Sequence, residues 1–160
     1  MADDMLRDKL IRNVGDLKLE RQQRAPLYDS MCAGVSDGTA AAKLGAGYDE
    51  LAPGQRSCPY HYHFGQEEMF VILDGAGTLR VAGAMLPVRT GDVVFIPPGP
   101  EYPHQFINTS NVVMKYLSIS TQERPELCVY PDSGKVGAFA KGMQVMNRPA
   151  TNLDYWDGEP

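Results

Sequence analysis

The chain has 160 residues, of which 43% are hydrophobic and 22% are charged, and this predicts one globular domain with a single core. A formal net charge of -5 and the lack of any run rich in Lys and Arg argue against a nucleic-acid partner. No stretch approaches the roughly 18 apolar residues of a membrane span. Residues 1–10 are charged and lack the apolar core of a secretory signal, so we expect a cytoplasmic protein.

Residues 1–26 are polar, with weak helical periodicity, and predict an N-terminal arm that holds at most one short helix. From Leu27 the pattern changes to short apolar segments separated by turn sequences. The expected strands cover residues 27–35, 43–51, 57–63, 68–73, 78–82, 85–88, 92–96, 104–108, 112–119 and 127–130. Residues 134–146 are expected to add a last helical turn before a polar tail over residues 147–160. Many short strands at regular spacing indicate an all-β antiparallel sandwich or barrel over residues 27–146.

The chain contains three histidines, and all of them lie among the central strands. His61 and His63 are two residues apart, so on a strand their imidazoles share one face and can both point into a barrel. Glu67 and Glu68 open the next strand, and one of these adjacent carboxylates faces inward. Two imidazoles and a carboxylate on one side suit a divalent first-row metal with open coordination positions. A strand that begins at His104 can bring the third imidazole to the same point.

The spacing around the first two histidines resembles the first of the two motifs of the cupin family. His61-x-His63 is followed by four residues and Glu68, and then by six residues and Gly75, as in that motif. The family's spacing selects Glu68 rather than Glu67 as the ligand. Glu67 is therefore expected to be an exposed strand residue, and a hydrogen-bond partner of a ligating histidine is the main alternative.

The second cupin motif is present as two matching halves. Gly91, five residues and Pro97–Gly99 match the first half, and His104, three residues and Asn108 match the second half. Four residues separate the halves where the family usually has two. This insertion at residues 100–103 affects the geometry of the loop, and His104 is still the expected ligand.

The resemblance implies an all-β fold, the double-stranded β-helix or jelly-roll barrel of the cupins. It also implies one divalent transition metal per chain, either Fe, Mn, Zn, Ni, Co or Cu, with four ligands: His61, His63, Glu68 and His104. Residues from about 43 to 136 further resemble a group of stand-alone small cupins, some of which are labelled sugar-phosphate isomerases by analogy. Small cupins often dimerise, so we expect a homodimer.

These expectations favour a metal-dependent enzyme that acts on a small polar metabolite as an isomerase, a lyase or a dioxygenase, with Lewis-acid activation at the metal. The alternative is a non-catalytic cupin that binds or senses a small ligand. Glu68 is a candidate base as well as a candidate ligand. Arg80 is either a contact for an anionic substrate or a solvent-facing residue. Tyr102 lies two residues before His104 and is expected to line the cavity.

The three cysteines, Cys32, Cys58 and Cys128, include no Cys-x-x-Cys pair, and we expect reduced, buried thiols that act as small hydrophobic residues. Cys58 lies three residues before His61, which is an odd number. On a regular strand its side chain would therefore face away from the metal ligands.

Overall fold

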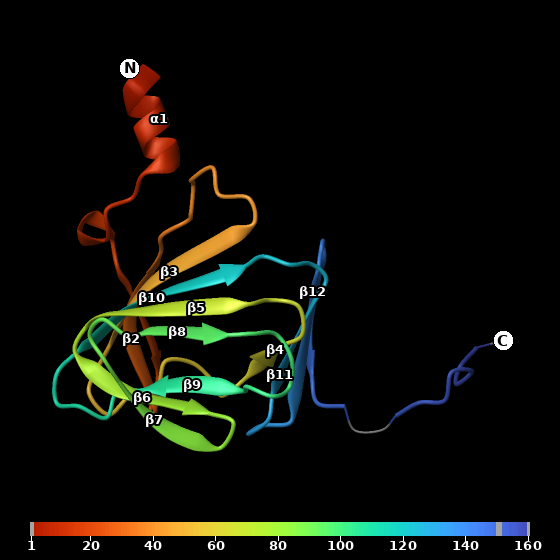
Figure 1. Ribbon diagram of the computed structural model, residues 1–160. Helices are drawn as coiled ribbons and strands as arrows, with labels where there is room; N and C mark the ends of the chain where they lie inside the picture. Colours follow the sequence, from red (N-terminus) through yellow and green to blue (C-terminus); the bar gives the residue numbers. More distant parts are fainter. Residues whose placement is uncertain (1, 150–151, 160) are drawn as a thin grey trace.

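The computed structural model describes residues 2–149 and 152–159, and most of its regular structure is antiparallel β-sheet (Figure 1). The elements in chain order are α1 (Ala2–Leu10), the 3-10 helix η1 (Val14–Asp16), β1 (Glu20–Arg24), β2 (Tyr28–Gly34), β3 (Leu44–Leu51), β4 (Tyr62–His63), β5 (Glu68–Asp74), β6 (Ala76–Val81), β7 (Ala84–Arg89), β8 (Val93–Ile96), β9 (His104–Ile107), β10 (Met114–Thr121), β11 (Glu126–Tyr130), β12 (Lys135–Ala140) and β13 (Met143–Asn147). Across the described residues, no helix has the length and apolar composition needed to cross a membrane.

The strands form three sheets that together build a jelly-roll barrel. A six-stranded sheet has the order β1-β2-β3-β10-β5-β8, a three-stranded sheet has the order β7-β6-β9, and a four-stranded sheet has the order β13-β12-β11-β4. Figure 1 shows the six-stranded and three-stranded sheets facing each other, with β4, β11 and β12 at one end. This arrangement confirms the all-β fold class that the sequence predicted.

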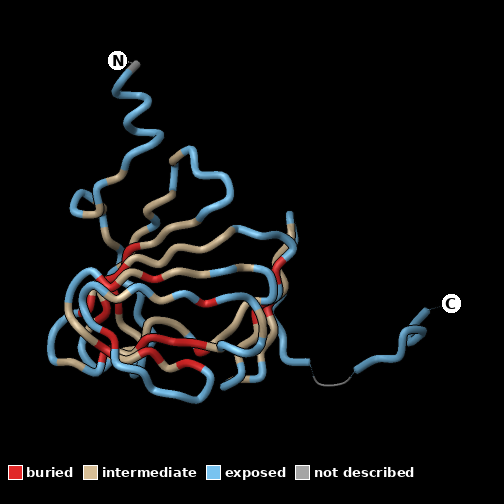
Figure 2. Tube along the Cα trace, in the orientation of Figure 1, coloured by how far each residue is buried: buried red, intermediate tan, exposed pale blue. Residues whose placement is uncertain are grey.

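The hydrophobic core lies between the six-stranded and the three-stranded sheets, where Figure 2 shows most of the buried residues. Phe106 on β9 is the centre of an aromatic group, with ring centroids 5.0 Å from Phe70 and 5.5 Å from Tyr116. The Phe70 ring also lies 5.6 Å from the ring of His104, at the edge of the same group. Burial of each such ring contributes about 1.5–3 kcal/mol of folding free energy. The core therefore fixes β9, and with it the backbone that carries His104.

Two predicted segments differ from the structure. Residues 134–146, predicted to hold a helical turn, form the β12–β13 hairpin, because Lys141–Gly142 makes a two-residue turn in which Gly142 has φ +75°. The first sheet also starts earlier than expected, because β1 lies within the segment interpreted as an arm and pairs with β2. The sequence of β1 hid this strand, since an edge strand needs no apolar residues and all five of its residues are exposed.

Candidate metal centre

The three histidines meet because two short chain segments pair across the end of the barrel. The backbone N–H of His104 donates to the carbonyl of His61 at 2.8 Å, and the N–H of His61 donates back at 3.2 Å. This two-way pairing places the two imidazoles on one side, with ring centroids 4.6 Å apart. His63 follows on β4, and its ring centroid lies 4.9 Å from that of His61. Glu68 reaches the same point from the first residue of β5.

The structure brings together all four residues that the cupin resemblance names as ligands. Glu68 Oε2 lies 2.9 Å from His104 Nε2 and 3.6 Å from His63 Nε2. The ligand atoms of His61, Glu68 and His104 all lie within 4.8 Å of one another, so this group could hold a metal ion. His104 is 1% exposed, and the other three side chains are partly buried.

Two polar atoms at the centre of this cluster lack hydrogen-bond partners. Glu68 Oε2 and His104 Nε2 are both buried, and their close approach is not aligned as a hydrogen bond. A buried polar atom without a partner costs about 1–3 kcal/mol, so such atoms usually mark a missing ion or water. A cation that binds both atoms would remove this cost. The residues therefore fit a divalent metal.

The protonation states also suit a cation. Burial lowers the pKa of His63, and the opposing effect of the Glu68 carboxylate does not restore it. Burial alone would raise the pKa of Glu68, but the neighbouring His104, His63 and His61 outweigh burial and hold that pKa below its ordinary value. Neutral imidazole and ionised carboxylate are the forms that bind a metal.

Backbone carbonyls orient two of the imidazoles. His61 Nδ1 lies 2.8 Å from the carbonyl oxygen of Pro59, and His104 Nδ1 lies 3.3 Å from that of Tyr102. A carbonyl oxygen only accepts, so in both rings Nδ1–H donates and Nε2 is left with its lone pair. This arrangement fixes the tautomer that a metal-binding histidine requires.

A buried carboxylate orients the third imidazole. Glu126 on β11 is 3% exposed, and its Oε1 lies 3.3 Å from His63 Nδ1. The same oxygen accepts from the N–H of Phe64 at 3.1 Å, and Oε2 accepts from the N–H of Gly65 at 3.1 Å. Glu126 thus links His63 to the turn that follows it. The sequence motifs did not point to Glu126, whose only signal is an acidic residue at the start of an apolar strand.

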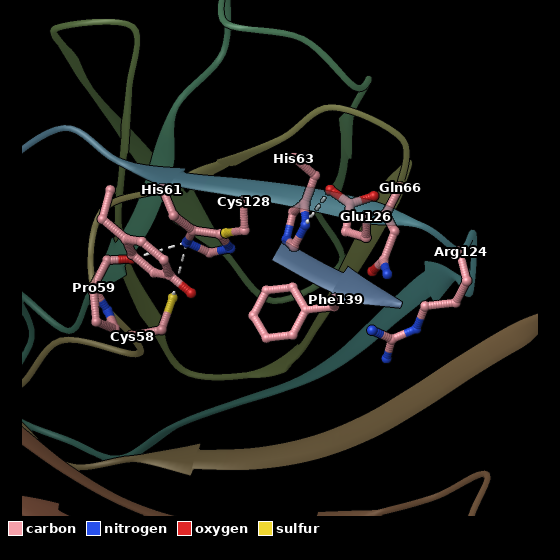
Figure 3. A pocket seen from close by; sticks show the side chains of 10 residues that line it. Cys58, Pro59, His61, His63, Gln66, Arg124, Glu126, Cys128 and Phe139 are labelled. Atoms are coloured by element: carbon pink, nitrogen blue, oxygen red, sulfur yellow. Dashed lines mark hydrogen bonds and ion pairs between the residues drawn. The ribbon is translucent and has the colours of Figure 1, made fainter. Parts of the chain in front are cut away.

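A pocket of about 270 Å³ opens onto the imidazoles of His61 and His63 (Figure 3). Its lining is contributed by the segments around β4 and by β11 and β12: Cys58, Pro59, His61, His63, Gln66, Arg124, Glu126, Cys128, Tyr130 and Phe139. Figure 3 shows Arg124 at the opposite end of the pocket from His61, with Phe139 between them. The Arg124 guanidinium lies 5.7 Å from the centroid of the Phe139 ring and has no salt bridge to any residue that the structure describes.

Comparison with known proteins places this arrangement in a family. Residues 47–120 match the sequence model of the cupin domain. A protein of Methanocaldococcus jannaschii, itself uncharacterised, is 31% identical over 97 residues, which are 61% of this chain and 70% of that protein. The chain belongs to the cupin superfamily. This assignment confirms the resemblance seen in the two sequence motifs.

Two further relatives show the range of proteins that resemble this cupin. The crystal structure of a candidate sugar phosphate isomerase from Acidithiobacillus ferrooxidans has a TM-score of 0.82 at 22% identity and covers 92% of this chain and 97% of that chain. An oxalate-binding protein of Thermotoga maritima is 34% identical over 70 residues, which are 44% of this chain and 55% of that protein. The first comparison shows that the shared fold extends over nearly the whole cupin chain.

Arg80 and Tyr102, the two candidate substrate contacts from the sequence, lie outside the pocket of this cupin. The Arg80 guanidinium binds both carboxylate oxygens of Asp132, at 2.6 and 2.8 Å, and stacks 3.8 Å from the centroid of the Tyr60 ring. Tyr102 is 46% exposed and does not line the cavity. Its contribution to the site is the backbone carbonyl beside His104 Nδ1.

Cys58 lies nearer to the site than strand alternation predicted. Its Sγ is 3.6 Å from His61 Nδ1, and the side chain lines the pocket. The expectation that it faces away was wrong because residues 57–60 form no regular strand and His61 forms only an isolated bridge, so alternation does not apply. Glu67 is exposed, as expected, and its N–H donates to Thr121 Oγ1 at 3.0 Å.

Proposed function

We propose that this cupin is a metal-dependent enzyme that acts on a small polar metabolite carrying a carboxylate or a phosphate group. The proposal rests on one observation, the unpartnered Glu68 Oε2 and His104 Nε2 within the histidine cluster at the inner end of a pocket. His61, His63, Glu68 and His104 would hold one divalent transition metal, which is Fe, Mn, Zn, Ni, Co or Cu. When bound, such an ion supplies Lewis-acid activation of a substrate hydroxyl, carbonyl or carboxylate oxygen.

The pocket residues define what the chain itself contributes. Phe139 and Tyr130 form apolar walls beside the imidazoles, against which the carbon skeleton of a substrate can pack. Arg124 and Gln66 supply hydrogen-bond donors at the other end, where the Arg124 charge is not neutralised by a described acidic residue. A guanidinium binds carboxylate or phosphate through two parallel hydrogen bonds. A pocket of about 270 Å³ suits a small metabolite.

Several reaction types remain compatible with these residues. A metal held by these residues would supply Lewis-acid activation in isomerisation, elimination or dioxygen-dependent cleavage, and Arg124 would hold the anionic group of the substrate in each case. Glu68 is a candidate base as well as a candidate ligand, and the neighbouring imidazoles hold its pKa below its ordinary value, so that it is ionised. The pocket residues therefore define the anionic group of the substrate, but they are compatible with more than one reaction class.

The first test is elemental analysis of the full chain purified without chelator or affinity metal. We expect about one transition-metal ion per chain and its loss in the His61→Ala/His104→Ala double variant. No metal in the native protein, even after reconstitution, would overturn the proposal. A tightly held organic ligand in that metal-free protein would instead support the non-catalytic binding module.

The second test concerns the anion. Small carboxylates and phosphate esters, screened by thermal shift against the metal-loaded protein, should raise the melting temperature. Arg124→Gln should weaken binding of the best compound about tenfold, because a charge-assisted bidentate contact is lost. Lys141→Gln, at the exposed turn of the β12–β13 hairpin, is the matched control and should leave binding unchanged. Equal affinity in the Arg124 variant would reject the assigned substrate class.

A further inference from the structure

A second group of ligand-type atoms lies beside the four residues already described. His61, His63 and Cys128 place an imidazole nitrogen or the thiol sulfur within 4.8 Å of one another. This group shares His61 with the group formed by Glu68 and His104. Cys128 has no counterpart in the two cupin motifs, because it lies beyond the end of the family match at residue 120.

Strand pairing explains why this thiol faces the site. β11 pairs with β4 in a register that sets Cys128 directly opposite His63. Alternate residues on a strand share a face, and Glu126, Cys128 and Tyr130 all line the same pocket. Glu126 on this face already contacts His63. The position of the sulfur is thus set by the same backbone that sets the orienting carboxylate.

The thiol lies on the side of the cluster from which a ligand enters. The pocket is lined by His61, His63 and Cys128, whereas Glu68 and His104 lie behind it, outside its lining. Because His61 belongs to both groups, an ion held at His61 would lie near the Cys128 sulfur.

We propose that Cys128 is a thiolate ligand on the pocket side of the metal, additional to His61, His63, Glu68 and His104. The inference rests on the proposed function, because it requires that a metal binds. Binding forms one metal–sulfur bond, breaks the S–H bond and releases one proton to solvent, with no change of oxidation state. A soft sulfur ligand favours zinc, cobalt, copper or iron over manganese. It also takes one of the open positions and so restricts how a substrate can bind.

Cys58 provides a matched control in the same pocket. Its Sγ lies 3.6 Å from His61 Nδ1, which is the nitrogen that faces the carbonyl of Pro59. The sulfur of Cys58 is thus next to the ring nitrogen that donates a hydrogen bond, and Cys58 belongs to neither of the two groups able to hold a metal. Comparison of Cys128→Ser with Cys58→Ser therefore distinguishes a thiol that binds the metal from a thiol that only lies nearby.

The experiment uses the full chain reconstituted with Co²⁺, which reports a bound thiolate by charge-transfer absorption in the near ultraviolet. We expect this band in the native protein and in Cys58→Ser, and its loss in Cys128→Ser with Co²⁺ still bound. Zinc affinity should fall about tenfold or more in Cys128→Ser, while manganese affinity changes less than about twofold. Circular dichroism checks that the variants fold, and Cys128→Ala is a second variant if the serine disrupts β11.

The outcomes separate this inference from the proposed function. Stoichiometric Co²⁺ without the charge-transfer band, or a band that survives in Cys128→Ser, would overturn the role of Cys128 and leave the four-ligand site standing. Failure of the native chain to bind Co²⁺ or any other transition metal would overturn both. Loss of the band in Cys58→Ser but not in Cys128→Ser would show that Cys58 is the thiolate ligand, and it would also overturn the inference.

Discussion

Replacement of Glu126 by glutamine tests whether the carboxylate orients His63 for the metal. The side chain is almost fully buried and makes three contacts, to the imidazole of His63 and to the N–H groups of Phe64 and Gly65. If the remaining amide oxygen of Glu126→Gln stays with His63 and Phe64, its NH2 group faces the N–H of Gly65. One buried donor is then unpaired, which should lower the free energy of unfolding by about 1–3 kcal/mol.

Glu126→Gln should also bind the metal more weakly than the native protein. Loss of the negative partner weakens the basicity and the alignment of a ligating imidazole, and such changes reduce metal affinity about 10- to 100-fold. The assay is a competition titration with a coloured chelator, beside thermal unfolding of the metal-free protein. Glu123→Gln, at an exposed residue three positions before Glu126 in the segment that leads into β11, is the control. Reduced stability with metal affinity within about twofold of the native value would refute the orienting role.

Three further predictions concern the barrel and its assembly. Burial raises the pKa of Asp49 from 3.8 to about 6. The folded-state pKa is therefore higher than the unfolded one, so the charged form weakens folding at neutral pH and this cost is removed as pH falls from about 6 towards 4. Asp49→Asn should raise the free energy of unfolding at pH 7 by up to about 3 kcal/mol, with the gain vanishing near pH 4 in urea titrations, and a gain independent of pH would contradict this cause. The Asn108 side chain donates to the carbonyls of Leu51 and Val112 at 2.8 and 2.7 Å, so Asn108→Ala should lower stability by about 2–4 kcal/mol in thermal unfolding, and a loss below about 1 kcal/mol would argue against this role. We also expect a homodimer in size-exclusion chromatography with light scattering, where the mass of a monomer would reject the prediction.

The sequence, together with the cupin spacing that selects Glu68, predicted that the four candidate ligands lie close together, because the determinants of their positions are local. The spacing of His61 and His63 places both rings on one side, and Glu68 opens the strand that follows at once. The buried strand that starts at His104 is marked by its own turn sequence, Pro97–Gly99. The two motifs therefore identified residues that the fold does bring together, although they say nothing of the atoms that stay unpartnered.

The residues around the cluster could not be predicted in the same way. Glu126 and Cys128 reach the site through the pairing of β11 with β4, which joins segments more than sixty residues apart. Periodicity gives the face of a strand but not its partner or its register. The position of Cys58 was missed for a different reason, because it lies in an irregular segment where no periodicity holds.

The match to the cupin domain ends at residue 120, so it contains all four candidate ligands but only part of the pocket. The remaining pocket residues lie beyond the match: Arg124, Glu126, Cys128, Tyr130 and Phe139. Two cupins with the same four candidate ligands can therefore differ in the opposite wall of the pocket if residues 121–147 differ. Because this stretch also carries Glu126 and Cys128 beside His63, a chimera that exchanges it between two relatives should change the metal affinity together with the ligand preference.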